Sequence, residues 1–267
     1  MRRRGLGFIG IFCMFVMLIT GCASSADKPA ADRPKDELIL AVGKEPEDGF
    51  DPTTGWGRYG SPLFQSTLLK RDQDMKIVND LATGYTVSPD GTIWNVTLRD
   101  DAKFSDGKPV TAADVKYTYE TAAKSGSVVD LQVLEDVEEV DEYTVKFILK
   151  EPRSTFIHSL ITLGIVPKHA HGENYAQNPI GSGPFKLVQW DKGQQMIVEP
   201  NPHYYGEKPF FKKLTFLFLT EDAAFAAAKA GKVDIAAIPA AFGKEKVEGM
   251  RLEAIKTVDN RGIMFPF

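Results

Sequence analysis

The chain has 267 residues, 43% of them hydrophobic and 25% charged, which is ordinary for a globular protein of one or two domains. A formal net charge of −4 gives no reason to expect binding to nucleic acid. Both cysteines, Cys13 and Cys22, lie near the N-terminus, so the body that follows has no disulfide, cysteine metal site or thiol nucleophile.

The first 22 residues have the pattern of a secretory signal. Arginines at positions 2–4 precede an uncharged apolar stretch at 5–19, and Leu18 to Gly21 leads into Cys22. The apolar stretch is shorter than the ~20 residues that a membrane-spanning helix needs. This ending resembles the bacterial lipobox, which implies that residues 1–21 are a lipoprotein signal peptide and that Cys22 is lipidated. We therefore expect an extracytoplasmic protein, anchored by lipid to the cell membrane in a periplasmic space or at a Gram-positive cell surface.

The next segment, residues 22–36, predicts a flexible tether because it is rich in small and polar residues and lacks large apolar side chains. After it, short alternating or continuous apolar runs predict strands. The predicted strands are 38–42, 94–99, 144–149, 185–190, 196–199, 214–219 and 233–236. The predicted helices are 63–69, 111–124, 156–163 and 221–230, and the Gly and Pro residues of 45–59 predict a loop.

Local signals support two of these helix ends. Thr111 and Asp114 have the spacing of a variant capping box at the start of helix 111–124, and Gly231 is suited to end helix 221–230. Strands and helices are mixed without a strict repeat. The sequence therefore predicts a mixed α/β architecture.

The stretch from Leu81 to Glu120 contains residues at fixed spacing that resemble a known signature. They are Ser88, Asp90, Gly91, Trp94, Leu98, Arg99, Phe104, Asp106, Gly107, Pro109, Thr111, Ala112, Asp114 and Val115. The runs Pro167 to His169, Gly181 to Phe185 and Ala230 to Ile235 extend the likeness. On these residues the chain resembles the extracytoplasmic solute-binding proteins of family 5, which serve ABC importers of peptides and nickel. Because Asp-Gly pairs are turn formers, the signature marks scaffold more than binding site.

The resemblance implies a fold and a division into domains. Family members are similar in having two lobes that close over a ligand, a periplasmic-binding-protein-like type II architecture of class α/β (mixed α+β). Carried onto this chain, 37–53 and 181–258 would form the first lobe, and 54–180 an inserted subdomain. Residues 259–267 would be the start of a truncated second lobe that is mostly missing, because family members are much longer. We expect such a chain to expose unpaired strand edges and to be unable to clamp a ligand alone.

The resemblance also points to ligand-binding residues in the loop after the first strand. Trp56 and Tyr59 could form apolar walls, Gly57 lies between them, and Arg58 could meet a carboxylate with two hydrogen bonds. In the alternative, the aromatic residues pack a domain junction and Arg58 is a solvated charge. The family places further contacts at the crossover into the second lobe. Asn260 and Arg261 lie there and could contact the ligand. In the alternative, they belong to a strand or face the solvent.

The four histidines do not predict a metal site. His169 and His171 are two residues apart and share a face only in an extended chain. His158 is predicted to be buried in an apolar segment with its hydrogen bonds satisfied, and His203 to be exposed. No cluster has metal-ligand spacing, so neither a metal ligand nor a cofactor is predicted. Nickel importers of the family are similar in binding a metal–chelator complex, so a nickel ligand stays open.

These inferences favour a solute-binding lipoprotein without catalytic activity. It would capture an oligopeptide, a dipeptide or a nickel–chelator complex and deliver it to the permease subunits of an ABC importer, with hinge closure selecting the liganded state. Two alternatives stay open: a truncated remnant that binds nothing, and an extracytoplasmic enzyme. The enzyme alternative is weak because the sequence has neither a Gly-x-Ser-x-Gly elbow nor a His-Glu-x-x-His motif.

Overall fold

The computed structural model describes residues 36–58, 63–125 and 129–253. Residues 1–21, Cys22 and the rest of the predicted tether up to position 35 lie outside the described residues, as does 259–267. Within the described ranges, no helix is long and apolar enough to cross a membrane.

Strands dominate the described part of the chain. In chain order they are β1 Glu37–Val42, β2 Leu69–Arg71, β3 Ile77–Asn79, β4 Ala82–Val87, β5 Ile93–Leu98, β6 Leu134–Asp141, β7 Thr144–Leu149, β8 Phe185–Asp191, β9 Gln195–Pro200, β10 Lys213–Phe218 and β11 Ile235–Ala236. The α-helices are α1 Ala112–Ser125, α2 Ile157–Thr162 and α3 Glu221–Lys229. Short 3₁₀ helices are η3 Pro52–Thr54, η4 Ser154–Phe156 and η5 Ala240–Phe242. The predicted mixed α/β class is therefore confirmed.

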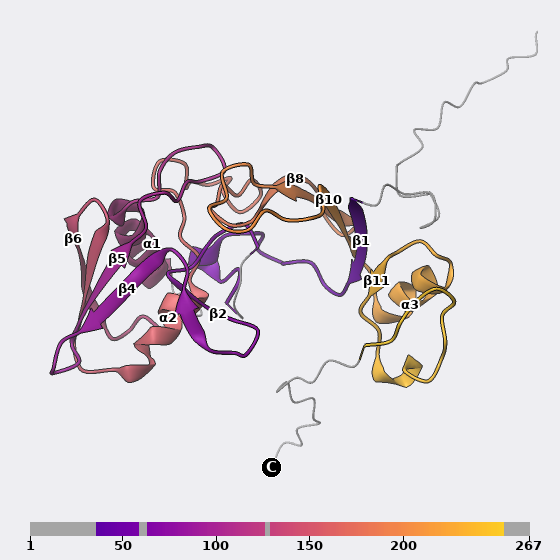
Figure 1. The fold of residues 1–267 in the computed structure, drawn as a ribbon, viewed down its shortest axis with the longest axis horizontal. Helices are drawn as coiled ribbons and strands as arrows, with labels where there is room; N and C mark the ends of the chain where they lie inside the picture. Colours follow the sequence, from indigo (N-terminus) through magenta and orange to yellow (C-terminus); the bar gives the residue numbers. More distant parts are fainter. Residues whose placement is uncertain (1–35, 59–62, 126–128, 254–267) are drawn as a thin grey trace, which may run out of the picture.

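A five-stranded sheet unites the start and the end of the described chain. Its order is β11-β1-β10-β9-β8, with β1 parallel to both β10 and β11, and β9 antiparallel to its two neighbours. Successive side chains of β1 point to opposite faces. Ile39 and Ala41 pack against Ala224 and Ala228 of α3, which covers one face at the right-hand end of Figure 1.

The opposite face of this sheet is lined by aromatic and aliphatic side chains. Leu38 and Leu40 of β1 pack there with Val198 of β9 and with Phe50 and Phe64, which come from the loops that follow β1. Because the loops contribute buried rings to this core, the segment after β1 is tied to the sheet by apolar burial, worth about 1.5–3 kcal/mol for a fully buried large side chain.

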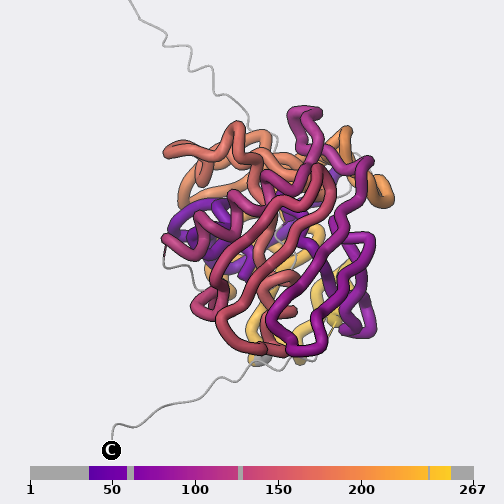
Figure 2. The backbone as a smooth tube through the Cα atoms, turned by 90° about the vertical axis from the view of Figure 1, so that its left-hand side faces the viewer, coloured from indigo at the N-terminus to yellow at the C-terminus, as the bar shows by residue number. Residues whose placement is uncertain are grey.

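A second, four-stranded sheet has the order β4-β5-β7-β6 and lies at the other end of the elongated molecule. Figure 2 looks onto this end, with β4 to β7 in front. Helix α1 packs on β6 and β7, and Tyr119 meets Phe147 edge-on with ring centroids 4.7 Å apart. This sheet and α1 build the largest core of the described residues.

The predicted strands all have counterparts, and the predicted helices over 111–124, 156–163 and 221–230 are confirmed as α1, α2 and α3. The described part of the predicted loop, 45–58, contains neither strand nor α-helix, only η3. The helix predicted over 63–69 is wrong, because this segment is irregular and leads into β2.

Long-range hydrogen bonds explain that error. The carbonyl of Phe64 accepts from the Gly183 amide at 2.7 Å, and the carbonyl of Ser66 accepts from the Ile165 amide at 2.9 Å. A helix would use these carbonyls for bonds to residues four positions later. Since distant segments take the carbonyls instead, tertiary structure overrides the local apolar pattern.

Candidate functional site

The candidate ligand loop follows β1 and is shaped by the 3₁₀ helix η3. Asp51 caps this turn, because its Oδ1 accepts hydrogen bonds from both the amide and the hydroxyl of Thr53, each at 2.8 Å. Pro52 occupies the first helical position, where no amide donor is needed. The turn ends at Gly55, so Trp56, Gly57 and Arg58 follow directly from a capped element.

The second oxygen of Asp51 joins this loop to α1 through a histidine. Its Oδ2 lies 2.9 Å from Nε2 of His171, and Nδ1 of the same ring lies 2.9 Å from the hydroxyl of Tyr117. A carboxylate only accepts, so Nε2 carries a proton. The Tyr117 hydroxyl can either donate to a neutral Nδ1 or accept from a protonated one. The imidazole therefore keeps both hydrogen bonds in either charge state.

Burial and hydrogen bonding act in opposite directions on Asp51. Burial alone would raise the pKa of its carboxyl, but hydrogen bonds from His171 and Thr53 outweigh this effect and hold the pKa below its usual range. The hydrogen bonds of the loop therefore favour the ionised, carboxylate form of Asp51. Sequence reasoning treated His171 only as a rejected metal ligand, since its partner lies 120 positions away.

Other contacts fix the same loop. The Phe50 amide donates to the carbonyl of Ala176 at 2.8 Å, and the Phe50 carbonyl accepts from Nε2 of Gln65 at 3.0 Å. At the far side, the Ser125 hydroxyl at the end of α1 donates to the carbonyl of Thr53. The loop is therefore held between the five-stranded sheet and the unit that contains α1.

Trp56 belongs mainly to the core of this junction. Its indole meets Phe50 edge-on at 5.0 Å and stacks on Phe64 at 6.4 Å. Its Nε1–H is buried without a hydrogen-bond partner among the described residues, which is a costly arrangement for a polar group. Packing accounts for the ring, but not for this unpaired donor.

Arg58 is exposed and lines a cleft of about 300 Å³ that also touches η4 and α2. Arg153 and His158 line the same cleft, with Asp130 as an acidic group. Two arginines and a histidine thus line one space together with Asp130, and the guanidinium of Arg153 also pairs with Glu151 at 2.6 Å. An arginine in such a cleft can bind an anionic group such as a carboxylate. Sequence reasoning did not connect Arg153 and His158 with Arg58, because nothing in their spacing places them together.

The prediction of a buried His158 is wrong, because the short helix α2 leaves this side chain exposed at the cleft. His203 is exposed as predicted. His169 lies 2.7 Å from a carboxylate oxygen of Asp106. Over the described ranges, no three His, Cys, Asp or Glu side chains are grouped so that they could hold a metal ion.

For three of the predicted ligand-binding residues, the structure gives no position relative to this cleft. Tyr59, Asn260 and Arg261 lie outside the described residues. Of the predicted ligand-binding residues, the structure therefore describes Trp56, Gly57 and Arg58, and of these Arg58 lines the cleft.

Comparison with known proteins identifies a family for this fold. A sequence model described as "Bacterial extracellular solute-binding proteins, family 5 Middle" matches residues 76–265. The probable D,D-dipeptide-binding periplasmic protein DdpA of Escherichia coli is 36% identical over 211 residues, which cover 71% of this chain and 40% of DdpA. The oligopeptide-binding protein AppA of Bacillus subtilis is 27% identical over a match that covers 94% of this chain and 51% of AppA.

Solved structures agree with these sequence matches. NikZ from Campylobacter jejuni, in complex with Ni(L-His), has a TM-score of 0.73 and 31% identity, covering 79% of this chain and 45% of NikZ. The structure of AppA with a nonapeptide has a TM-score of 0.70 and 26% identity, covering 79% of this chain and 46% of AppA. The chain spans about half the length of the curated relatives it matches. It belongs to the bacterial extracellular solute-binding proteins of family 5.

Proposed function

We propose that this chain serves as the solute-binding component of an ABC importer, which captures a short peptide or a nickel–chelator complex and passes it to a membrane permease. The observation that carries the proposal is the family match over residues 76–265. The relatives support both ligand classes, since AppA was solved with a nonapeptide and NikZ with Ni(L-His).

Both ligand classes share a carboxylate, and the cleft that Arg58 lines has the chemistry to bind one. We propose that Trp56, Gly57, Arg58 and Tyr59 form one wall of the ligand site, and that Asn260 and Arg261 add contacts. Arg153 adds a second guanidinium to the cleft, and His158 adds an imidazole that can donate a hydrogen bond. An arginine can hold a carboxylate through two parallel hydrogen bonds, which gives orientation as well as affinity.

We further propose the domain division given by the resemblance. Residues 37–53 and 181–258 would form the first lobe, 54–180 the inserted subdomain, and 259–267 would lead toward a second lobe. The composition of the two sheets supports this division: β1 pairs in one sheet with strands after position 184, whereas the other sheet uses only 82–149.

The N-terminal sequence supports the proposed location. A signal peptide at 1–21 and a lipidated Cys22 would hold the folded body outside the cytoplasm at the membrane surface, next to a permease. The segment 22–36 would be the tether between the lipid and β1.

Calorimetric titration of the 267-residue chain with a dipeptide, a pentapeptide and nickel–histidine tests the proposal. Even without closure of a second lobe over the ligand, we expect saturable binding of at least one probe. We also expect a loss of about tenfold or more in affinity for Arg58→Ala, because a charged hydrogen bond contributes about 1.5–3 kcal/mol. Arg251→Ala is the matched control, since this exposed arginine pairs only with Glu253 among the described residues. Turnover of a peptide, or equal losses in both variants, would contradict the proposal.

A further inference from the structure

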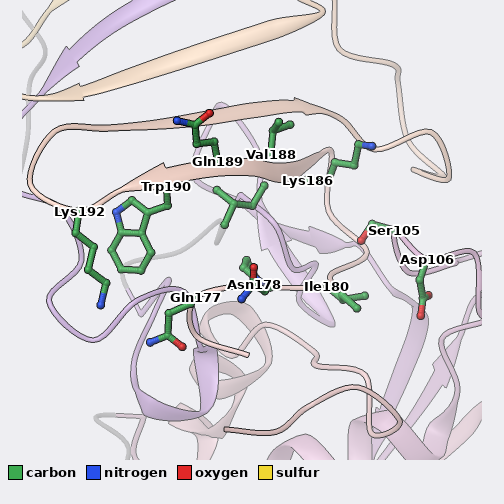
Figure 3. A pocket seen from close by; sticks show the side chains of 12 residues that line it. Ser105, Asp106, Gln177, Asn178, Ile180, Lys186, Val188, Gln189, Trp190 and Lys192 are labelled. Carbon is green, nitrogen blue, oxygen red and sulfur yellow. The ribbon is translucent and has the colours of Figure 1, made fainter. Parts of the chain in front are cut away.

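A groove of about 620 Å³ runs along the outer edge of β8, separate from the cleft at Arg58 (Figure 3). The five consecutive residues from Lys186 to Trp190 line it, and no residue of β9 does. β9 pairs with one edge of β8 and contributes nothing to the lining, so the groove lies toward the edge that β9 leaves free. Residues 177–180 form the opposite wall.

The main chain of β8 is open toward this groove. β8 is the last strand of the five-stranded sheet and pairs with β9 alone among the strands of the described residues. An open edge offers amide and carbonyl groups to which an extended peptide can pair as an added strand. On the facing wall, the side-chain amides of Gln177 and Asn178 lack a hydrogen-bond partner in the described part of the chain. They are therefore available to form hydrogen bonds with the far edge of an added peptide strand.

The charges along the groove favour an acidic occupant. Lys186 lies near one end and Lys192 at the other, and neither forms an ion pair with a described residue. The carboxylate in the lining, Asp106, is already engaged by His169 at 2.7 Å. The apolar side chains of Val188, which is 50% exposed, and Ile180 lie between the two lysines.

A sugar is a poorer match for this groove, because the Trp190 ring that could stack on it already has two close neighbours. The Lys192 ammonium lies over its ring at 4.9 Å, and Phe50 packs against it edge-on at 4.8 Å. The register of β8 against β9 shifts between Leu187 and Gln189, which marks a β-bulge. The bulge interrupts the edge, so the occupant must be short.

We propose that this groove binds a short, extended, acidic peptide segment, which pairs with the edge of β8 and sets its carboxylates against Lys186 and Lys192. The site shares no lining residue with the cleft at Arg58 and does not depend on the solute proposed for that cleft.

The probe for the test is the fluorescein-labelled pentapeptide Glu-Val-Thr-Val-Glu, titrated with the 267-residue chain and followed by fluorescence anisotropy. We expect saturable binding that weakens about tenfold or more in the double variant Lys186→Glu, Lys192→Glu. The control, Lys208→Glu with Lys244→Glu, makes the same charge change away from the groove and should bind as the unaltered chain does. Circular dichroism of each variant confirms that it is folded.

Two further measurements separate strand pairing from simple charge attraction. A peptide with proline at its centre should lose binding because proline has no amide donor, and hydrogen exchange at Val188 and Gln189 should slow when the first peptide binds. Absence of binding at millimolar peptide, equal binding of the proline peptide, or equal losses in both double variants would overturn the proposal. Displacement of the labelled peptide by chitotetraose, a short sugar chain, would also overturn the proposal.

The two sites are distinguished by the variant Arg58→Ala. Because a peptide can also bind at Arg58, the pentapeptide titration is repeated in the Arg58→Ala background. Binding that persists there and is weakened by Lys186→Glu with Lys192→Glu assigns the peptide to the groove, whereas loss of all binding in this background would place the peptide in the other cleft and refute the groove.

Discussion

Asp51 divides its two carboxylate oxygens between two tasks. One oxygen caps η3, and the other binds His171, which in turn meets Tyr117 on α1. Because the folded state holds the pKa of Asp51 below its usual range, this carboxylate stabilises the fold above the unfolded pKa of about 3.9. The contribution is lost as the pH falls through the lower folded pKa.

Asp51→Asn should therefore destabilise the protein by about 1–3 kcal/mol at pH 7, since it removes charged hydrogen bonds at a buried position. It should also flatten the fall in stability between about pH 5 and pH 2, because the group that titrates is gone. Urea unfolding at a series of pH values measures both effects. Asp48→Asn, at an exposed position three residues earlier, is the control; identical curves for the two variants would contradict this account.

Cys22 gives a prediction that depends only on the sequence. Cys22→Ser should stop the incorporation of labelled palmitate and release the protein from the membrane fraction, because serine provides no thiol for lipid attachment. Cys13→Ser changes the other cysteine and should leave lipidation intact. Equal labelling of the Cys22→Ser variant and the unaltered chain would refute the anchor.

At the level of elements, the sequence correctly predicted those strands and helices whose position is set by a local pattern of residues. The alternation in β5 and β7 puts apolar residues on one face, and both strands appear where expected. Helix α1 starts where Thr111 and Asp114 indicated, with the carboxylate of Asp114 accepting from both the amide and the hydroxyl of Thr111. By contrast, β6 was missed because its sequence is largely acidic and only Val137 is buried.

The site was predictable only in part, for the same reason. The resemblance pointed to the loop with Trp56 and Arg58, but Arg153, His158 and His171 reach it through tertiary structure alone. Neither hydrophobic period nor motif spacing carries information on such long-range contacts.

The segment from Gly181 to Pro184 shows how elements from different parts of the chain are joined. A Cβ at Gly181 would lie 2.0 Å from the carbonyl oxygen of Phe64. The carbonyl of Gly181 accepts a hydrogen bond from the Ser105 amide at 2.8 Å. Gly181→Ala should therefore cost about 1–3 kcal/mol through overpacking against backbone that cannot move aside easily. Gly84→Ala, where a Cβ meets nothing within 4 Å, should change stability by less than about 0.5 kcal/mol.

Chemical denaturation of the two glycine variants checks this difference. Similar stabilities for Gly181→Ala and Gly84→Ala would mean that the close approach at Gly181 relaxes without cost.

At the scale of the whole molecule, two sheet units are connected by buried loops around Phe50, Phe64 and Asp51. The candidate ligand loop lies at this junction, and the cleft at Arg58 is otherwise lined by residues 129–162, which belong to the unit with the four-stranded sheet. The edge of β8 adds a second recognition surface with a different chemistry.

The central claim, that this chain binds a solute in its folded state, is tested most directly by thermal unfolding of the 267-residue chain. The scan is repeated with the dipeptide, the pentapeptide and nickel–histidine, each at about 1 mM. We predict one cooperative transition that at least one probe shifts upward, because a ligand at about 100 times its dissociation constant stabilises the native state by about 2.7 kcal/mol. A transition that none of the probes moves would contradict the claim.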